Sequence, residues 1–348
     1  MSTTYSEACS LGSLLSAYGR ARKAGRYRDS ALSFSYHLES NLLALHRELM
    51  DGTYVHGPYR EFIVNDSKKR RIKAATFRDR VVHQALHAAI EPLFEAVFIR
   101  DSYACRKGKG THQALRRITT WIMREGDRYP YALACDISKY FASINQEVLM
   151  GLLARQVSDT RLLGLCRIVV ESASDDLGVG MPIGNLTSQL FANVYLHELD
   201  CFVKRRLGMR RYIRYMDDFI IFGTDSASLQ KTKKEIAVFL TGTLTLALHP
   251  TKAVIFPIPS GLTFLGYRLF RHHRKLRKST VRRFARRTRC LAGQVAAERI
   301  ELETLANGIR SWRAYADAAA SRGLIRSLSS RLGVPFRPIA RRAVTTNH

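Results

Sequence analysis

Apolar residues recur along the chain at two spacings, and each spacing predicts a different element. Leu38, Leu42, Leu45 and Leu49 recur every three or four positions, and Asp51-Gly52 follows as a stop signal, so this segment predicts an amphipathic helix. The sequence RYMDDFIIFG, residues 214–223, has the apolar run of a buried strand. Asp217 and Asp218 interrupt that run, although burying an ionised carboxylate without a partner is strongly unfavourable.

The N-terminal part of the chain predicts helices on both sides of a short β-like segment. Residues 1–56 have a helical pattern, and a β-like run follows at residues 62–64. We expect a basic turn at residues 66–71 and a further helix from about Phe77, with its apolar residues at positions 81, 82, 86 and 90 facing inward.

Strand-like and helix-like segments alternate through the centre of the chain. Apolar runs such as YALACDI and LTFLGYRLF predict strands, and the segments between them predict amphipathic helices. Asn145, and either Thr187 or Ser188, are suitable N-caps for two of these helices. From residue 268 the sequence becomes basic and helix-like, which indicates a second lobe with its boundary near residues 268–275.

The charge of the chain narrows the class of partner. The 56 Lys and Arg residues against 29 Asp and Glu give a formal net charge of +27. Such a field attracts polyphosphates regardless of their sequence. A generic solubility charge is the alternative interpretation, but an excess this large favours a nucleic-acid partner.

The cysteines and the hydropathy indicate a cytoplasmic protein. Six cysteines are scattered without the spacing of a zinc site, which predicts reduced thiols. No uncharged apolar run reaches transmembrane length, and the N-terminus lacks the basic-then-apolar order of a signal peptide.

The carboxylates carry the candidate chemistry. Neighbouring side chains of a regular strand point to opposite faces, so Asp217 and Asp218 need a tight turn at residues 216–218 to reach one site. If Asp136, which ends the run YALACDI, lies on an adjacent strand, three carboxylates converge, and such oxygen ligands suit Mg²⁺. Two Mg²⁺ ions about 3.5–4 Å apart serve in-line phosphoryl transfer, which indicates polymerase or nuclease chemistry. An exposed turn is the better interpretation of an isolated Asp-Asp pair, but not beside Asp136.

At these residues the chain resembles the reverse transcriptases, over most of its length. The sequence Tyr215-Met216-Asp217-Asp218 is similar to the metal-binding hairpin of that family, and Asp136 to its partner aspartate. The resemblance implies that these three aspartates are catalytic and hold two Mg²⁺ ions while a primer 3′-hydroxyl attacks a dNTP. It also implies an α+β fold of the right-hand polymerase type, with fingers, a palm built on an antiparallel sheet and a helical thumb.

Two further segments extend the resemblance. Phe141, five residues after Asp136, stands where these polymerases carry an aromatic gate against the ribose 2′-hydroxyl. Residues 180–200 resemble the loop and helix that touch the nascent base pair and the template, where Gly184 allows close backbone approach.

Ile183 points to a subfamily. It replaces the glutamine that many reverse transcriptases carry at the third position of this loop. Together with Thr187-Ser188-Gln189, it resembles the enzymes of diversity-generating retroelements, which copy a template RNA with frequent misincorporation opposite adenine to diversify a target gene, a process called mutagenic retrohoming. The resemblance further implies a small pentameric accessory protein as a partner.

The remaining site predictions come partly from the resemblance and partly from the placement of basic residues, such as the glycine-flanked loop of residues 106–110 that opens a helix at Thr111. FLGY, residues 264–267, is similar to a primer-grip hairpin, and Lys252 to a lysine near the leaving pyrophosphate, where it could act as general acid. For any single basic residue, a surface or structural ion pair is an equally good interpretation. The predicted nucleotide-binding residues are Lys69, Arg71, Arg80, Phe141, Ile183, Gly184, Gln189 and Lys252, and the predicted nucleic-acid-binding residues are Arg106, Lys107, Lys109, Gly266, Arg277 and Lys278.

The predicted organisation is a helical N-terminal extension at residues 1–56, fingers and palm at 57–270 and a basic helical thumb at 271–348. The expected partners are template RNA, the cDNA primer and product, and dNTPs, with no membrane. An antiphage-defence or group II intron-type reverse transcriptase is the close alternative, although an intron enzyme would normally carry additional DNA-binding segments. A non-catalytic basic RNA-binding protein is the alternative from another class, but it would not need three mutually repelling carboxylates.

Overall fold

The computed structural model describes residues 3–23, 25, 27–65, 69–172 and 178–333. The chain divides into two compact units, each of which is described by itself. The first comprises Met1–Gly110, Leu133–Phe222 and Ser226–Ile255, and the second comprises Thr111–Ala132, Gly223–Asp225 and Phe256–His348.

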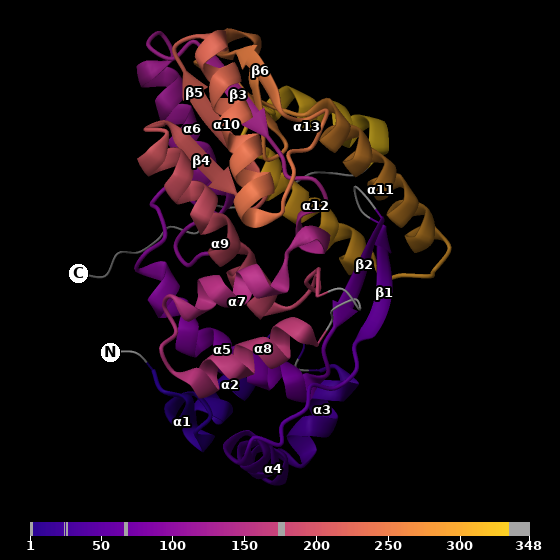
Figure 1. Cartoon of the computed structure of the whole chain (residues 1–348). Coiled ribbons are helices and arrows are strands. Elements are labelled where there is room, and N and C mark those ends of the chain that lie inside the picture. The colour runs from indigo at the N-terminus through magenta and orange to yellow at the C-terminus, as the bar shows by residue number, and fades with distance from the viewer. Residues whose placement is uncertain (1–2, 24, 26, 66–68, 173–177, 334–348) are drawn as a thin grey trace, which may run out of the picture. The chain divides into compact units, whose positions relative to one another are not determined.

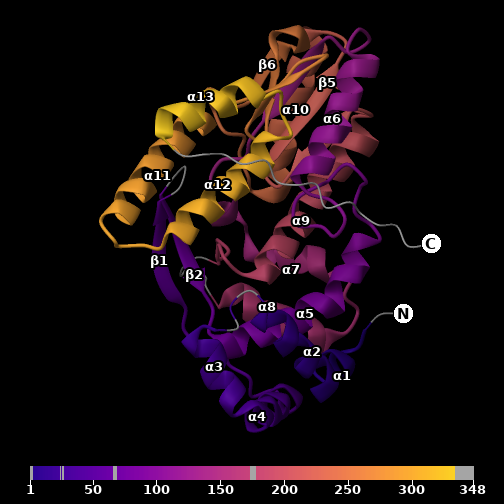
Figure 2. The same ribbon diagram turned by 180° about the vertical axis from the view of Figure 1, so that it is seen from behind.

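The first unit begins with helices, as predicted for residues 1–56. In α4, three leucines of the predicted face are buried and Gly52, with φ of 72°, ends the helix, so the prediction for this segment is confirmed. Figure 2 shows these helices grouped with α5, against which α1, α2 and α3 pack. The helices are α1 (Tyr5–Ala8), α2 (Leu11–Arg22), α3 (Asp29–Tyr36) and α4 (Leu38–Asp51).

An antiparallel hairpin of β1 (Arg60–Asn65) and β2 (Lys69–Ala74) precedes α5 (Phe77–Glu95). The predicted helix from Phe77 is confirmed, and its four predicted apolar residues are buried. The predicted basic turn is wrong for residues 69–71, because these residues form part of β2. Residues 66–68 lie outside the described residues.

Strands β4, β5, β3 and β6 form a four-stranded sheet in that order (Figure 1). Strands β4 and β5 form an antiparallel hairpin, which confirms the predicted strand, turn and strand. The strands are β3 (Tyr131–Cys135), β4 (Tyr212–Tyr215), β5 (Asp218–Gly223) and β6 (Val254–Pro257).

Helices connect these strands. Asn145 caps α7 by accepting a hydrogen bond from the Val148 backbone N–H, as predicted, whereas α9 begins after Asn185, so neither Thr187 nor Ser188 is its cap. From residue 187 to residue 196 every position of α9 except Gln189 is buried, as expected for a helix in the middle of a core. The connecting elements are the 3₁₀ turn η1 (Tyr140–Ser143), α7 (Gln146–Ala154), α8 (Thr160–Glu171), α9 (Leu186–Cys201), the π-helical turn η2 (Phe202–Arg206) and α10 (Ser226–Leu244).

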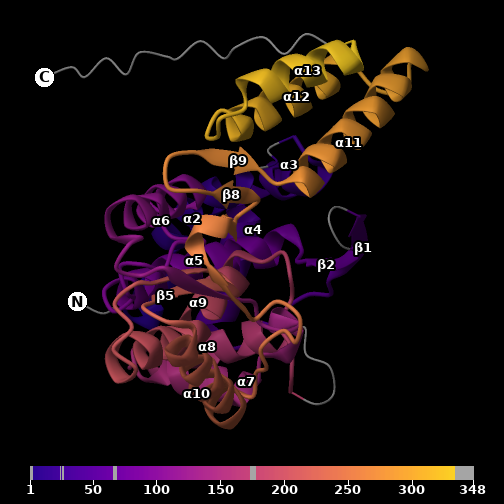
Figure 3. The same cartoon turned by 90° about the horizontal axis from the view of Figure 1, so that it is seen from above.

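The second unit combines a small antiparallel sheet, β7-β8-β9, with helices. Figure 3 shows α11 leaving this sheet directly after β9, and α11 packs against α12 and α13. The predicted boundary between residues 270 and 271 falls inside this sheet, since β9 pairs with β8. The elements are α6 (Thr111–Glu125), η3 (Ile258–Ser260), β7 (Leu262–Phe264), β8 (Tyr267–Leu269), β9 (Arg274–Leu276), α11 (Lys278–Ala296), α12 (Leu302–Ala316) and α13 (Arg322–Leu332).

Candidate active site

The β4–β5 hairpin carries the Asp-Asp pair on a two-residue turn. Tyr215 pairs with Asp218, so Met216 and Asp217 form the turn and Asp218 opens β5, whose remaining residues are buried. Met216 has a φ of 56°, a left-handed conformation that costs a residue with a Cβ about 1–2 kcal/mol. The surrounding contacts must therefore stabilise this turn.

Asp136 directly follows β3, the neighbour of β5 in the sheet. Its carboxyl shares a hydrogen bond with Asp218 and forms an ion pair with the Lys252 ammonium. Its backbone carbonyl accepts a hydrogen bond from the His249 N–H at 2.7 Å. The structure thus brings together Asp136, Asp217, Asp218 and Lys252, residues spread over more than a hundred positions of the chain.

Burial and neighbouring negative charges raise the pKa values of Asp217 and Asp218. Burial raises the pKa of Asp217, and the negative charge of Asp136 raises it further, while Lys252 and Arg70 act in the opposite direction. Desolvation by the surrounding protein, followed by the charges of Asp217 and Asp136, raises the pKa of Asp218 to about 7. The carboxyls therefore compete for positive charge.

The donor set fits Mg²⁺ in its chemistry, because hard divalent cations prefer carboxylate oxygens and a cation relieves the repulsion that raises these pKa values. Among the described residues, no group of three or more His, Cys, Asp or Glu side chains already stands in an arrangement that could hold a metal ion. Asp136 instead contacts Lys252 and Asp218. A cation at Asp136 would compete with the Lys252 ammonium.

Phe141 lies in η1, close after Asp136 in the sequence. Its ring is partly exposed and meets Tyr140 edge-on, with the ring centroids 5.4 Å apart. Tyr140 is anchored through a hydrogen bond from its hydroxyl to the Ala192 carbonyl at 2.5 Å, and the Phe141 carbonyl accepts from the Met181 N–H at 2.9 Å. The backbone at Phe141 is thus tied to the segment that leads into the loop of Ile183.

The loop of Ile183 and Gly184 contacts the β1–β2 hairpin. The Ile183 carbonyl accepts a hydrogen bond from the Lys73 N–H at 3.2 Å, while the Ile183 side chain is exposed. Gly184 has a φ of 129°, and a Cβ there would lie 3.0 Å from Cγ2 of Ile72. The close approach at Gly184 is thus to β2, and Gln189 is the exposed position on the buried stretch of α9 that follows.

The two faces of β2 separate its basic residues. Arg71 is 72% exposed in its side chain and lies 3.6 Å from the Glu61 carboxylate on β1. Its neighbour Arg70 points to the opposite face, as successive residues of a strand do, and its charge acts on Asp217. Arg70 was missed from the sequence, although the alternation of a β2 strand would have separated it from Arg71. The Lys69 side chain lies outside the described residues.

Two of the predicted basic residues, Arg80 and Arg106, have partners within the protein itself. Arg80 donates a hydrogen bond to the Ala21 carbonyl of α2 at 2.9 Å and stacks over the Phe77 ring, so it joins α5 to α2. Arg106, with a side chain only 6% exposed, donates to both oxygens of Glu95 and to two backbone carbonyls. Its Nε and Nη1 donors are therefore engaged within the protein itself.

The other predicted nucleic-acid contacts have mixed surroundings. Lys107 is exposed, whereas Lys109 donates to the Arg100 carbonyl at 2.7 Å and lies over the Tyr103 ring. In the second unit, Gly266 has a φ of 85° and its carbonyl accepts from the Arg277 N–H at 2.9 Å. Arg277 and Lys278 are exposed at the start of α11.

Comparisons with known proteins identify the family of the chain. The family model described as reverse transcriptase (RNA-dependent DNA polymerase) matches residues 64–269. Protein YkfC of Escherichia coli (strain K12) is 28% identical over 67% of this chain and 72% of its own length. The group II intron-encoded protein LtrA of Lactococcus lactis subsp. cremoris is 25% identical over 79% of this chain and 56% of its own length.

Among solved structures, the telomerase from Candida albicans in complex with a TWJ fragment of telomeric RNA matches with a TM-score of 0.47 and 12% identity, over 80% of this chain and 57% of that chain. Within the described part of the chain, no helix is both long and apolar enough to cross a membrane.

Proposed function

Because the chain belongs to the reverse transcriptase (RNA-dependent DNA polymerase) family, we propose that it copies a template RNA into DNA at the cluster of Asp136, Asp217 and Asp218. The observation that carries this proposal is the convergence of the three carboxyls, where desolvation and, after it, the charges of Asp217 and Asp136 raise the pKa of Asp218 to about 7. A strongly basic chain with one acidic cluster suits a polyphosphate substrate with divalent cations. The decisive experiment is removal of one carboxylate by Asp217→Asn, which should abolish DNA synthesis.

The proposed reaction is attack of a primer 3′-hydroxyl on the α-phosphate of a dNTP. Two Mg²⁺ ions held by the three aspartates would stabilise the attacking and the leaving oxygens. Around them, Arg70 supplies positive charge for the triphosphate, and the partly exposed Phe141 ring limits the space at the sugar. Lys252, which bridges to Asp136, holds a proton close to where the pyrophosphate leaves.

The role of Arg70 gives a prediction with a control one residue away. We expect Arg70→Ala to raise the KM for dNTP about tenfold, since a charge-assisted hydrogen bond contributes roughly 1.5 kcal/mol. Arg71→Ala removes the same charge from the opposite face of β2, next to Glu61, and should change the KM less than about twofold. Steady-state incorporation on a homopolymer template measures both. If both substitutions raised the KM equally, the effect would come from the overall positive charge of the chain and not from a contact of Arg70 with the triphosphate.

We further propose that the enzyme is error-prone and serves a diversity-generating retroelement. Ile183 supports this, because an exposed apolar side chain stands in the loop that touches the nascent base pair in the resembled enzymes, where a glutamine is common. Apolar contact without hydrogen bonds discriminates weakly between bases of similar shape.

Ile183→Gln tests this proposal. We expect it to lower misincorporation opposite template adenine about fivefold, equivalent to ~1 kcal/mol of added discrimination. Ile183→Leu keeps an apolar side chain and should leave the error spectrum unchanged. Sequencing of cDNA made in vitro from one defined RNA gives the error frequency at each template base. An unchanged spectrum in the Gln variant would mean that this loop does not set fidelity.

Service to a group II intron is the second candidate. The similarity to LtrA, which is named as a group II intron-encoded protein, favours it. The two proposals differ in partner: a retroelement enzyme should depend on a small pentameric accessory protein and a repeat-derived template RNA, whereas an intron enzyme should bind its intron RNA. Co-purification of RNA with the full chain, followed by sequencing, separates them.

A further inference from the structure

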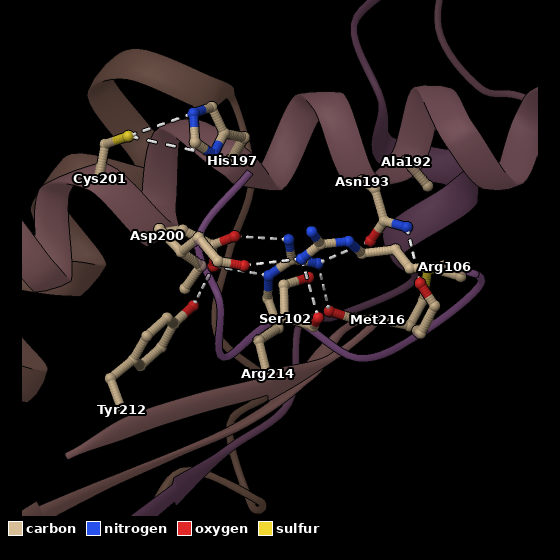
Figure 4. Close-up of polar contacts among 12 residues, drawn as sticks. Ser102, Arg106, Ala192, Asn193, His197, Asp200, Cys201, Tyr212, Arg214 and Met216 are labelled. Atoms are coloured by element: carbon tan, nitrogen blue, oxygen red, sulfur yellow. Dashed lines mark hydrogen bonds and ion pairs between the residues drawn. The ribbon is translucent and has the colours of Figure 1, made fainter. Parts of the chain in front are cut away.

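A buried ion pair of Arg214 and Asp200 lies close to Met216, the first residue of the β4–β5 turn (Figure 4). Arg214 of β4 and Asp200 of α9 have no solvent-exposed side-chain area. Arg214 Nε donates to Oδ1 of Asp200 at 2.7 Å and its Nη2 to Oδ2 at 2.6 Å, which is a bidentate pair. Tyr212 also donates to Asp200, at 2.6 Å.

The third nitrogen of Arg214 reaches the turn. Its Nη1 donates to the Met216 carbonyl at 3.2 Å and to Oδ1 of Asn193 at 3.2 Å. The Met216 carbonyl and the Asp217 N–H belong to one planar peptide group, so a bond to the carbonyl orients the N–H as well. That N–H in turn contacts the carboxylate of Asp217 itself. A continuous set of contacts thus runs from Asp200 through Arg214 to the Asp217 carboxylate.

The Arg214 backbone is fixed independently of its side chain. Its N–H donates to the Asp101 carbonyl, and its carbonyl accepts from the Tyr103 N–H, both at 3.0 Å. The guanidinium therefore extends from a rigid strand position, and the bidentate contact with Asp200 sets its plane. A buried ion pair is weak evidence for stability, because apolar residues of similar volume often stabilise a protein equally well. Its place next to Met216, whose φ is positive, points instead to a role in holding that turn.

We propose that Arg214, held by Asp200, is a positioning residue that locks the Met216–Asp217 peptide and so aims the Asp217 carboxylate at a divalent cation. The inference rests on the proposed function, since it requires Asp217 to be a cation ligand. Arg214 itself touches neither substrate nor cation in this scheme. It acts through the peptide group of the turn.

Arg214→Lys is the central variant. A lysine keeps the charge but cannot contact Asp200 in a bidentate manner and reach Met216 at the same time. We expect Mn²⁺ binding to the full chain, measured by electron paramagnetic resonance, to weaken about tenfold, the factor that loss of one charged hydrogen bond produces. The Mg²⁺ concentration for half-maximal DNA synthesis should rise by a similar factor. Tyr212→Phe removes another hydrogen bond to Asp200 without touching the turn, and should leave both quantities within about twofold.

A double variant separates positioning from stability. Arg214→Met with Asp200→Leu fills the same space with apolar groups, and we expect a melting temperature near that of the wild type but Mn²⁺ binding as weak as in Arg214→Lys. This variant decides the matter even if Arg214→Lys does not fold. Recovery of Mn²⁺ affinity in the double variant would overturn the proposal and leave a purely structural ion pair. Asp217→Asn serves as the baseline: if it binds Mn²⁺ like the wild type, the proposed function has failed, whereas its loss of binding together with unchanged Arg214 variants rejects only the positioning role.

Discussion

Asp217→Asn is expected to abolish DNA synthesis while RNA binding stays intact. Asparagine has the shape of aspartate without its charge, so the turn of Met216 and Asp217 should keep its conformation. Loss of an anionic cation ligand removes several kcal/mol of transition-state stabilisation. At 1.36 kcal/mol for each factor of ten, about 4 kcal/mol lowers kcat on the order of 10³-fold. Single-turnover extension of a primer on an RNA template measures the loss, and filter binding of the same RNA measures affinity.

Asp225→Asn is the control for this experiment. Asp225 carries an exposed carboxylate that accepts a hydrogen bond from the Thr224 hydroxyl, outside the carboxylate cluster. The substitution makes the same change in net charge, so any general electrostatic gain in RNA affinity appears in both variants. Wild-type synthesis by Asp217→Asn would contradict the two-metal proposal. An equal loss of synthesis in Asp225→Asn would show that the loss follows from the change in net charge and not from loss of a cation ligand.

The β4–β5 hairpin and the leucine helix are predictable because they depend on local rules. Two carboxylates in an apolar run require a turn, and the turn fixes both the register of β4 with β5 and the direction of Asp217. The leucine helix ending at Gly52 follows from spacing and a stop signal in the same way. Such features need no knowledge of distant partners.

The basic residues were harder to predict because their roles depend on distant partners. Arg80 and Arg106 donate hydrogen bonds to backbone carbonyls of other segments, and the sequence composition does not indicate these bonds. Arg70 was missed because its face depends on where β2 begins, and residues 69–71 were expected in a turn. Arg214 carried no signal in the sequence beyond its place before the Asp-Asp pair, since Asp200 lies on another element. Basic residues are numerous in this chain, so the role of any one of them can be assigned only from its tertiary contacts.

Gly184→Ala is expected to be the second most damaging substitution. Gly184 has a backbone conformation that residues with a side chain rarely adopt, and there is little space for a Cβ at this position. At φ of 129° an added Cβ is strained, and it would lie 3.0 Å from Cγ2 of Ile72 and 3.1 Å from the Lys73 carbonyl oxygen. The backbone oxygen cannot yield as a flexible side chain would, so the loop must move away from β2. We expect about 2–4 kcal/mol of destabilisation from strain and overpacking. The loop carries Ile183, and a displacement near 1 Å can lower the rate about 10²-fold.

Two other glycines separate the causes of this loss. Gly52→Ala introduces the same type of backbone strain at φ of 72° with no atom within 4 Å of the new Cβ, so it should cost about 1–2 kcal/mol without an effect on incorporation. Gly151→Ala lies in α7 with open space and no positive φ, and should be neutral or stabilising by up to about 1 kcal/mol. Chemical denaturation gives the three free energies of unfolding, and single-nucleotide incorporation gives the three rates. Suppose that Gly184→Ala is destabilised like Gly52→Ala yet incorporates dNTPs at the wild-type rate. Its strain would then have no effect on catalysis, as expected for Gly52→Ala, and this loop would be excluded from the nucleotide site.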